Sequence, residues 1–306
     1  MSSPDLTVCI LNWNTQGLLR DCLRSLLDTR QGLGGEVEVM VVDNASEDGS
    51  AEMVRQQFAE VTLIQNERNL LYAGGNNVAA RQASGRHILF LNTDTVVDCA
   101  ELAKMVSFMD AHPTAGICGP LQFDGAGNIC RLPAPFPSVG SYLCRLLGLG
   151  RHRTSVYQAG HPPVPVDVVS GACLLIRADL GRQLGFFDEQ FDLYANDTDL
   201  CFRARQAGCE VWYLPECYIV HYGGRSTGRM PSDAAAAKTI AAHAAFIGKQ
   251  YRPFTARLLR ALFAAQLYRW VLSRAVSCAL SLGRSERRRR RFRDAVQLLR
   301  AYRQCP

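Results

Sequence analysis

The chain has 306 residues, of which 48% are hydrophobic, so it is long enough for one α/β domain with an appendage and too apolar to be disordered throughout. Its net charge of +6 is unevenly distributed, because residues 1–225 carry 17 Lys or Arg and 25 Asp or Glu, whereas residues 226–306 carry 17 and 3. A basic C-terminal segment of this kind suits an anionic surface, either lipid headgroups or nucleic acid.

Short apolar runs alternate with segments of helical periodicity along the first third of the chain. Apolar runs rich in β-formers predict strands, and apolar residues at helical spacing predict helices. The expected elements are strands at residues 6–11, 37–42, 61–65 and 87–91, and helices at residues 17–29, 50–58 and 74–84. Because strands and helices alternate, we predict an α/β fold with a Rossmann-like, mostly parallel sheet flanked by helices.

The rest of the chain is less regular. Residues 122–165 are rich in Gly, Pro and Arg, and this composition predicts long loops. Further elements are expected as a strand-like segment at residues 166–177, helices at 179–184 and 197–207, and short strands at 211–214 and 218–221. From about residue 235 the composition predicts helix. We therefore expect a main domain at residues 1–230 and a helical, Arg-rich extension at residues 231–306.

Polar side chains follow three of the predicted strands. In parallel sheets, ligands bind beyond the carboxyl ends of the strands. The residues at these ends are Asn12 and Asn14, Asp43 and Asn44, and Asn92 and Asp94. Each alone could equally be a turn former or a helix cap, but three ends converge on one crevice. Asp94 is also placed to hold a hard divalent cation, which could in turn bind a diphosphate.

A second group of charged residues begins at the predicted helix 197–207. The helix dipole stabilises anions at this end, and Asp199 can pair with Arg203 four residues later. Asp197 could be a general base for a substrate hydroxyl, or only a helix cap. Farther along, His221 follows a strand, where a histidine can also be a packed residue, and Arg225 suits contact with phosphate.

Together these residues resemble glycosyltransferase family 2, which has the GT-A fold, and they look most like its bacterial rhamnosyltransferase-type branch. The matching segments occur in the family's order and cover about residues 7–227. They are ILNWN (10–14), VVDNASEDGS (41–50), NLLYAGGNN (69–77), LNTDT (91–95), VSGA (169–172), GFFDE (185–189), NDTDLCFR (196–203) and HYGGRST (221–227). Each motif alone is weak, whereas the ordered set is specific.

The resemblance implies a role for each matched position. Asp43 would contact the nucleobase, and the other residues binding the nucleotide donor would be Asn12, Asn14, Asn77, Asn92 and Arg225. Asp94 and His221 would lie at a Mg²⁺ or Mn²⁺ ion that bridges the donor diphosphate. Asp197 would deprotonate the acceptor hydroxyl. The sugar or acceptor pocket would be lined by Gly171, Ala172 and Asn196.

The implied activity is an inverting, metal-dependent hexosyl transfer from a nucleotide-sugar donor. Rhamnose from deoxythymidine-diphosphate rhamnose is the lead donor, with uridine-diphosphate sugars next. The acceptor would be lipid-linked or a polysaccharide in cell-envelope glycan synthesis. Thr93 stands where the family usually has Pro, which leaves the carboxylate of Asp94 in place. Asn196 stands where it usually has Glu, which puts the acceptor contact of that Glu in doubt.

Two other functions are compatible with such a sheet. One is a catalytically inactive nucleotide-sugar-binding module, which remains an alternative because Asn196 stands in place of the family's usual Glu. A nucleotidyltransferase could share the metal carboxylate, but it would be expected to carry a Gly-rich, basic phosphate loop after the first strand. The chain has NWNTQ at residues 12–16 instead, which argues against it.

The C-terminal extension predicts association with a surface. Residues 253–283 are largely apolar, but arginines interrupt them well before the ~20 apolar residues that a membrane span needs. These arginines do not share one helical face, so a clean amphipathic helix is not predicted. Residues 284–293 hold seven arginines. We expect residues 253–306 to contact an anionic membrane surface, although a solvated charge run or packing on a second subunit, giving a homo-oligomer, stays open.

Nucleic acid is a less suitable partner for this extension, because the arginine run lacks interleaved aromatic residues beyond Phe292. The N-terminus lacks the basic and apolar regions of a signal peptide. The twelve cysteines include no C-x-x-C pair and several lie in apolar runs, as reduced core cysteines do. We therefore expect a cytoplasmic protein, peripheral on the inner face of the cell membrane.

Overall fold

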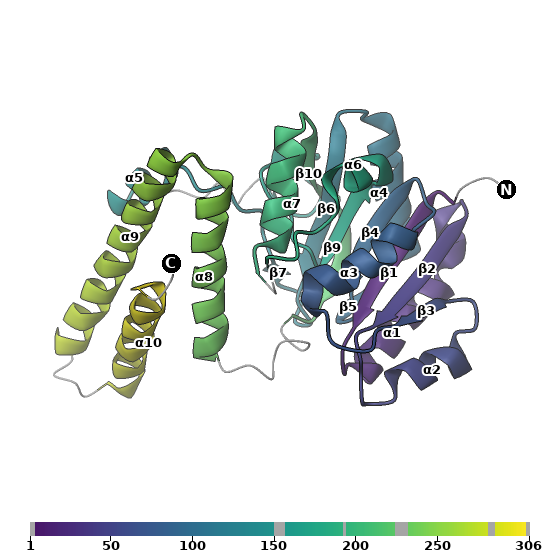
Figure 1. The fold of residues 1–306 in the computed structure, drawn as a ribbon, viewed down its shortest axis with the longest axis horizontal. Helices are drawn as coiled ribbons and strands as arrows, with labels where there is room; N and C mark the ends of the chain where they lie inside the picture. Colours follow the sequence, from purple (N-terminus) through teal and green to yellow (C-terminus); the bar gives the residue numbers. More distant parts are fainter. Residues whose placement is uncertain (1–3, 150–156, 192–193, 224–231, 281–284, 304–306) are drawn as a thin grey trace. The chain divides into compact units, whose positions relative to one another are not determined.

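The computed structural model of the chain describes residues 4–149, 157–191, 194–223, 232–280 and 285–303. The chain divides into two compact units (Figure 1). The first contains Met1–Phe136 and Thr154–Arg229, and the second contains Pro137–Arg153 and Met230–Pro306. The segment Pro137–Arg153 thus groups with the C-terminal part of the chain, and a domain boundary at residue 230 stays a prediction.

The first unit is built on one mixed sheet with the strand order β3-β2-β1-β4-β9-β6-β10-β5. Its first four members are mutually parallel and confirm the four predicted N-terminal strands. They are β1 (Leu6–Asn12), β2 (Val37–Asp43), β3 (Thr62–Gln65) and β4 (His87–Asn92). β1, β2 and β4 are buried almost throughout, which explains why they are continuous apolar runs instead of alternating ones.

An antiparallel strand, β9 (Cys173–Arg177), lies between β4 and β6 (Ala115–Phe123). The long strand β10 (Glu210–His221) then runs parallel to β6. Three short strands complete the sheet by antiparallel pairing: β5 (Thr95–Val96) and β8 (Val164–Val166) on β10, and β7 (Ile129–Cys130) on β6.

The two strands predicted at residues 211–214 and 218–221 are one strand, β10. Its pairing with β6 is irregular between Leu214 and Tyr218. Pro215 lies in this interval and has no N–H to donate, so the ladder is interrupted there without ending the strand.

Helices cover both faces of the sheet, and each face has its own core. One core contains side chains of α1 (Gln16–Asp28), α2 (Ser50–Gln57) and α4 (Cys99–Ala111), and a short 3₁₀ turn, Arg30–Leu33, follows α1. The other contains side chains of α3 (Leu71–Gln82), α6 (Ala178–Leu184) and α7 (Asn196–Gln206). Successive β1 residues alternate between them, as the period of a strand requires.

Helix α3 begins at Leu71, three residues before its predicted start, and therefore includes Gly74 and Gly75. A Cβ atom at Gly75 would lie 2.4 Å from Cδ1 of Leu11 on β1. Gly75 lowers the helix propensity of this segment, but because it has no Cβ it lets α3 approach β1 closely.

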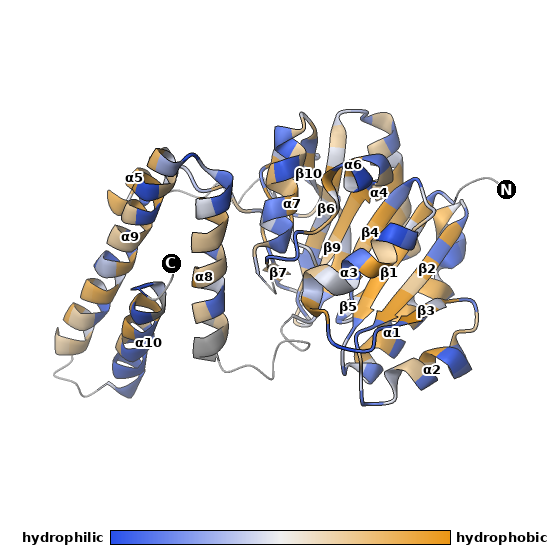
Figure 2. Cartoon of the chain, in the orientation of Figure 1, coloured by the Kyte–Doolittle hydropathy of each residue, from blue (hydrophilic) through white to orange (hydrophobic). Residues whose placement is uncertain are grey.

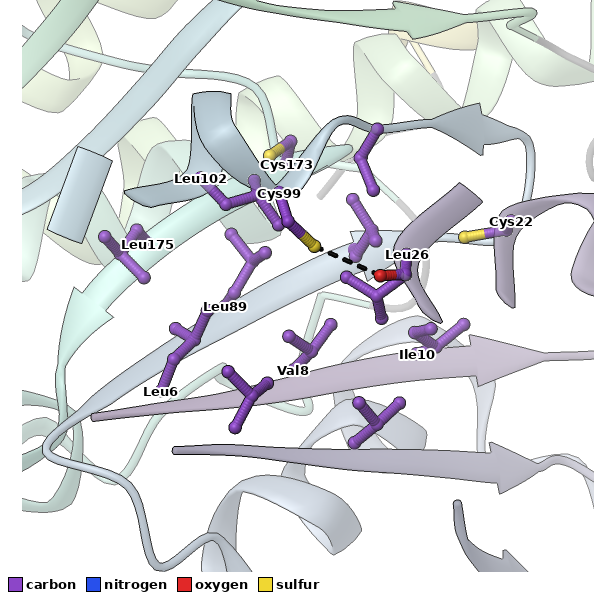
Figure 3. Close-up of a cluster of buried hydrophobic side chains, with 14 of the residues drawn as sticks. Leu6, Val8, Ile10, Cys22, Leu26, Leu89, Cys99, Leu102, Cys173 and Leu175 are labelled. Atoms are coloured by element: carbon purple, nitrogen blue, oxygen red, sulfur yellow. Dashed lines mark hydrogen bonds between the residues drawn. The ribbon is translucent and has the colours of Figure 1, made fainter. Parts of the chain in front are cut away.

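Several cysteines are core residues, as expected. Figure 3 shows Cys22, Cys99 and Cys173 among the aliphatic side chains of β1, β4 and β9, and Cys99 Sγ donates to the Leu26 carbonyl at 3.1 Å. Burial raises the pKa of Cys22 to about 12, so the group stays a neutral thiol. In the described part of the chain every cysteine is free.

The second unit is helical and consists of α5 (Val139–Leu146), α8 (Ser232–Gln250), α9 (Pro253–Leu280) and α10 (Glu286–Arg303). The prediction of loops throughout residues 122–165 is wrong at α5, where Ser138 and Ser141 form a capping box that starts a helix within a Gly- and Pro-rich segment. Among the residues that the structure describes, no helix has the length and apolar character needed to cross a bilayer.

His243 on α8 couples the stability of the helical unit to pH. Its Nε2 lies 2.5 Å from the Tyr142 hydroxyl, and its ring centroid lies 4.8 Å from that of Phe263. Burial, with a smaller effect of Arg145, lowers the pKa of His243 from 6.5 to about 4. The unfolded chain therefore binds a proton near pH 6.5 that the folded chain binds only near pH 4, so stability is lost as the pH falls through this window.

We expect His243 to lower the free energy of unfolding by up to about 3 kcal/mol between pH 6.5 and 4. Urea titrations across this range measure the effect, with His243→Gln as the comparison because glutamine does not titrate. The wild type should lose more stability than the variant as the pH falls. Parallel pH profiles for the two proteins would contradict the assignment.

Candidate active site

The first predicted site residues meet where β1 and β2 end side by side. Asn12 and Asp43 are register partners and are almost fully buried. Asn12 Nδ2 donates to Asp43 Oδ1 at 2.9 Å and to Ser46 Oγ at 3.0 Å, and the Ser46 N–H donates to Asp43 Oδ2 at 3.0 Å. The Asp43 carboxylate is therefore held rigidly at the carboxyl edge of the sheet, as the alternation of strands and helices predicts.

Asn14 joins the same cluster through its backbone. Its N–H donates to Ser46 Oγ at 2.9 Å, and its side-chain oxygen accepts from the Glu47 N–H at 2.8 Å. Asn14 has a φ of 53°, which asparagine tolerates better than most residues. Between Asn12 and Asn14, Trp13 is 43% exposed.

Asn77 on α3 has a different environment. Its side-chain oxygen accepts from the Phe187 N–H at 3.0 Å, and its Nδ2 donates to the Phe187 carbonyl at 2.8 Å and to Glu189 Oε1 at 3.1 Å. These bonds use the amide to hold the segment before α7. Its assignment to the nucleotide pocket stays a prediction.

Asp94 lies in the turn between β4 and β5, and His221 lies at the end of β10. The antiparallel pairing of Thr95 with His221 brings them together, and the Tyr222 N–H donates to the Asp94 carbonyl at 3.0 Å. His221 Nε2 is 3.3 Å from Asp94 Oδ1. Both side chains are buried, and neither carboxylate oxygen of Asp94 has a hydrogen-bond partner.

Gln122 on β6 orients the imidazole of His221. Its Oε1 lies 3.1 Å from Nδ1 of His221, and because an amide oxygen can only accept, Nδ1 carries the proton. Nε2 is then the nitrogen that faces Asp94. A histidine fixed in this way through its other nitrogen is typical of metal ligands.

The pair of Asp94 and His221 fits a divalent cation. A buried carboxylate with no hydrogen bond is costly, and a bound cation would relieve that cost. Within the described residues, no cluster of three or more His, Cys, Asp or Glu side chains is suited to a metal ion. The pair would thus supply two ligands, a number typical of hard cations that also bind phosphate oxygens and water.

Asp197 lies in the first turn of α7 and is only partly buried. Its Oδ2 accepts from the Gly171 N–H at 3.1 Å, and its Oδ1 accepts from the Thr198 N–H at 2.7 Å. The Tyr72 hydroxyl donates to the Gly171 carbonyl at 2.8 Å. Burial raises the pKa of Tyr72, so this hydroxyl remains a donor. Asp197 thus has a fixed orientation while part of it faces solvent, as a general base requires.

Two short series of contacts link the Asn12–Asp43 cluster, Asp94 and Asp197 into one site. The Thr15 hydroxyl donates to Asn12 Oδ1 at 2.7 Å and lies 3.0 Å from the hydroxyl of Thr93, the residue before Asp94. On the other side, the Asn92 N–H donates to the Ala172 carbonyl at 3.0 Å, next to Gly171 and therefore to Asp197. The structure thus connects the ends of β1, β2 and β4 with the start of α7.

Asn196 precedes Asp197 and is 3% exposed, yet neither polar atom of its side chain has a hydrogen-bond partner. The predicted donor contact Arg225 lies outside the described residues. Four residues with a role in this arrangement were missed by sequence reasoning: Thr15, Ser46, Tyr72 and Gln122. Tyr72 and Ser46 lie within the matched motifs, whereas only pairing in space reveals Gln122.

The expected pair of Asp199 and Arg203 is present and buried. Arg203 Nε donates to Asp199 Oδ2 at 2.7 Å, and the other guanidinium nitrogens donate to the carbonyls of Leu184 at 2.8 Å and Phe186 at 2.6 Å. Asp199 is fully buried. This pair fixes α7, and with it Asp197, against the segment that follows α6.

Removing the guanidinium of Arg203 should therefore destabilise the protein strongly. We expect Arg203→Met to lower the free energy of unfolding by about 3–5 kcal/mol, because it removes the guanidinium that pairs with the buried carboxylate of Asp199. Arg205→Met, at an exposed position of the same helix, is the matched control and should cost less than about 0.5 kcal/mol. Urea unfolding measures both, and equal costs would refute the structural role of the pair.

Comparison with known proteins identifies the family. The family model described as glycosyl transferase family 2 matches residues 7–135, and that described as glycosyl transferase family group 2 matches residues 87–304, more than half of the chain. The chain belongs to glycosyl transferase family 2. This family 2 glycosyltransferase is accordingly an enzyme, and Asp43, Asp94 and Asp197 lie in its first unit.

Two curated relatives are rhamnosyltransferases. The N-acetylglucosaminyl-diphospho-decaprenol L-rhamnosyltransferase of Mycobacterium tuberculosis is 29% identical over 219 residues, covering 66% of this chain and 71% of the relative. The rhamnosyltransferase WbbL of Escherichia coli is 24% identical over 213 residues, covering 66% of this chain and 79% of the relative. The family 2 glycosyltransferase therefore resembles rhamnosyltransferases, as its motifs suggest.

The fold is also that of solved glycosyltransferases. The mannosyltransferase PcManGT of Pyrobaculum calidifontis, in complex with GDP-Man and Mn²⁺, superposes with a TM-score of 0.62 at 19% identity, covering 98% of this chain and 86% of that one. The predicted GT-A type of fold, a mixed α/β sheet flanked by helices and followed by C-terminal helices, is thus confirmed.

Proposed function

We propose that this enzyme is an inverting, metal-dependent glycosyltransferase that moves rhamnose from deoxythymidine-diphosphate rhamnose to a lipid-linked acceptor in cell-envelope glycan synthesis. The observation that carries the proposal is the linkage, in one site, of the Asp94 carboxylate, which accepts no hydrogen bond, with the oriented, partly exposed carboxylate of Asp197. The relative from M. tuberculosis, named for a decaprenol-linked acceptor and for rhamnosyl transfer, supports this choice of donor and acceptor.

The nucleotide of the donor would occupy the end of β1 and β2. Asp43 is held by Asn12 and Ser46, so its carboxylate can accept from a base N–H without paying further conformational entropy. Trp13 follows Asn12 in the chain and is exposed, so its ring would be accessible for stacking with a base. The proposal assigns the nucleobase to these residues.

The diphosphate of the donor would lie near Asp94 and His221. These two residues would hold Mg²⁺ or Mn²⁺, and the Mn²⁺ in the complex of the Pyrobaculum mannosyltransferase supports a divalent cation here. When bound, such an ion neutralises the negative charge that develops on the leaving diphosphate.

Asp197 would act as the base on the acceptor. The proton of the acceptor hydroxyl passes to the carboxylate of Asp197, and the acceptor oxygen bonds to the anomeric carbon while the bond from that carbon to the diphosphate oxygen breaks. Because attack and departure occur on opposite faces of the sugar, the configuration inverts and no covalent enzyme intermediate is needed. The Gly171 N–H keeps the carboxylate in place during this step.

The proposal includes a peripheral location on the inner face of the cell membrane, where a lipid-linked acceptor is accessible. The basic C-terminal segment supports this location, because anionic headgroups attract arginine.

Release of nucleoside diphosphate by the purified enzyme tests the proposed donor. The enzyme is incubated with Mg²⁺ or Mn²⁺, membrane lipid extract and each of several nucleotide sugars. We expect release from deoxythymidine-diphosphate rhamnose, dependent on both lipid extract and metal. Release from another donor alone would overturn the choice of rhamnose. Binding of a nucleotide sugar with no release under any condition would favour the inactive binding module instead.

A further inference from the structure

Helix α9 in the second unit has an exposed face that is mostly apolar and is interrupted by the exposed Arg269. Phe254 is 79% exposed, Leu272 is 65% exposed and Leu280 is 78% exposed. At 100° per residue, the large exposed side chains lie within about 60° of one line along the helix. We call them the α9 stripe, and they are Phe254, Leu258, Tyr268, Leu272, Val276 and Leu280.

The opposite face of α9 is the one used for packing within the unit. The Arg260 guanidinium donates to the Ala244 carbonyl of α8 at 3.1 Å, and Gln266 donates to the Tyr142 carbonyl of α5 at 2.9 Å. Phe263 packs edge-on against Tyr302 of α10 with ring centroids 5.4 Å apart. The α9 stripe is therefore left over after α5, α8 and α10 have packed on this helix.

This arrangement explains why the sequence shows no amphipathic pattern in α9. Arg260 and Arg274 are partly buried, with a fully buried Nε in each, and Arg274 lies over the Trp270 ring at 5.7 Å. Both faces of the helix are thus largely apolar, and two of the arginines belong to the inner one. In Figure 2, α9 is accordingly coloured tan to orange along most of its length, whereas α10 is largely blue.

Arginines of α10 border the α9 stripe. Arg303 Nε donates to the Tyr268 hydroxyl at 3.0 Å, and its guanidinium lies 5.4 Å from the centre of that ring. Nearer the other end, Arg288 Nη1 donates to the Ser277 carbonyl at 3.1 Å, next to Val276. The exposed run Arg287–Arg291 thus begins beside the stripe.

We propose that the α9 stripe and the arginines of α10 form one docking face for the surface of an anionic bilayer. The inference rests on the proposed membrane location and names the residues that provide it. Apolar side chains would enter the acyl boundary, and the arginines would contact the headgroups, with α9 lying in the plane of the interface. At ~1.5 Å per residue, the residues of the α9 stripe are spread over about 40 Å of the helix.

A bilayer fits this face better than a second copy of the chain does. Two copies docked through the stripe would bring two arginine-rich borders close together, which like-charge repulsion disfavours. Anionic lipid complements both parts of the face at once, because it supplies an apolar interior and negative headgroups.

Co-sedimentation of the full-length protein with vesicles tests the docking face. The vesicles contain phosphatidylcholine alone or mixed with phosphatidylglycerol, and no sugar donor or acceptor is present, so the outcome is independent of transferase activity. We expect binding to the mixed vesicles that weakens with salt. Leu272→Gln with Val276→Gln should lower the partition coefficient by about tenfold or more, because two apolar contacts are lost without a change of charge.

Two further variants separate the parts of the face. Arg289→Gln with Arg290→Gln should weaken binding by roughly fivefold for each arginine. Ile129→Gln with Leu132→Gln removes two exposed apolar side chains from the first unit instead, and should leave binding unchanged. Thermal melting and gel filtration confirm that each variant is folded.

Equal binding by the wild type and the stripe variant, or no binding of the wild type to either vesicle, would overturn the proposal. A wild-type dimer that the stripe variant dissociates, with no vesicle binding, would overturn it in favour of a second copy of the chain.

Discussion

Asp197→Asn is expected to lower kcat by about 10²–10⁴-fold while the free energy of unfolding changes little. The amide cannot take a proton from the acceptor, whereas its oxygen can still accept from the Gly171 N–H or the Thr198 N–H. Nucleoside-diphosphate release measures kcat, and urea unfolding measures stability. KM for the donor should stay close to that of the wild type, because Asp197 acts on the acceptor.

Asp199→Asn is the matched control, two residues later on the same helix. It removes the buried counter-charge of Arg203 and should cost about 3 kcal/mol of stability. In folded protein its kcat should fall far less than that of Asp197→Asn, because the carboxylate of Asp197 is unchanged. The two substitutions are chemically identical, so opposite effects on kcat and stability would separate the base from the ion pair. A kcat loss in Asp199→Asn as large as that in Asp197→Asn would contradict the assignment.

Asp94→Asn is expected to abolish activity and to weaken binding of Mn²⁺ at least tenfold, because the principal anionic ligand is lost. In the metal-free protein the same change should raise the free energy of unfolding by about 1–2 kcal/mol, since it removes a buried carboxylate that has no hydrogen bond. Electron paramagnetic resonance of free Mn²⁺ measures the binding, and urea unfolding with a chelator present measures the stability.

Asp98→Asn serves as the control for this change. Asp98 accepts from the Ala100 N–H at 2.9 Å as the N-cap of α4, a role that asparagine performs equally well. Activity, Mn²⁺ binding and stability should all stay close to the wild type. A metal-free Asp94→Asn protein that is less stable than the wild type would show that the carboxylate has a structural partner and is not held ready for a cation.

The parallel half of the sheet was predictable because its strands obey local rules. β1, β2 and β4 are short, buried, apolar runs, and polar residues follow each of them. Position at a strand end was enough to bring Asn12 and Asp43 together. Helical spacing likewise predicted the pair of Asp199 and Arg203, which the structure confirms.

Long-range pairing was not predictable in the same way. Gln122 orients His221 only because β6 and β10 are neighbours, and these strands are about 100 residues apart in sequence. Tyr72 reaches Gly171 across a similar separation. The sequence also did not reveal the exposed face of α9. An apolar residue looks the same in the sequence whether its helix face is covered by another element or exposed to solvent.

Asn196 was predictable from the sequence only in part. Its position in the motif was recognised as a departure from the family pattern, but the sequence could not show that its amide is buried without a partner. Both polar atoms of this amide are closed off from solvent, so in this structure the residue that stands in place of the usual Glu offers no accessible contact for a substrate hydroxyl.

Product analysis tests the central claim most directly. The enzyme is incubated with deoxythymidine-diphosphate rhamnose, a divalent cation and membrane lipid extract, and the lipids are then analysed by mass spectrometry and NMR. We predict a lipid-linked glycan that has gained one deoxyhexose, with an anomeric configuration opposite to that of the donor. Release of nucleoside diphosphate without a new glycosidic bond, or a product that retains the donor configuration, would contradict single-displacement transfer at Asp94 and Asp197.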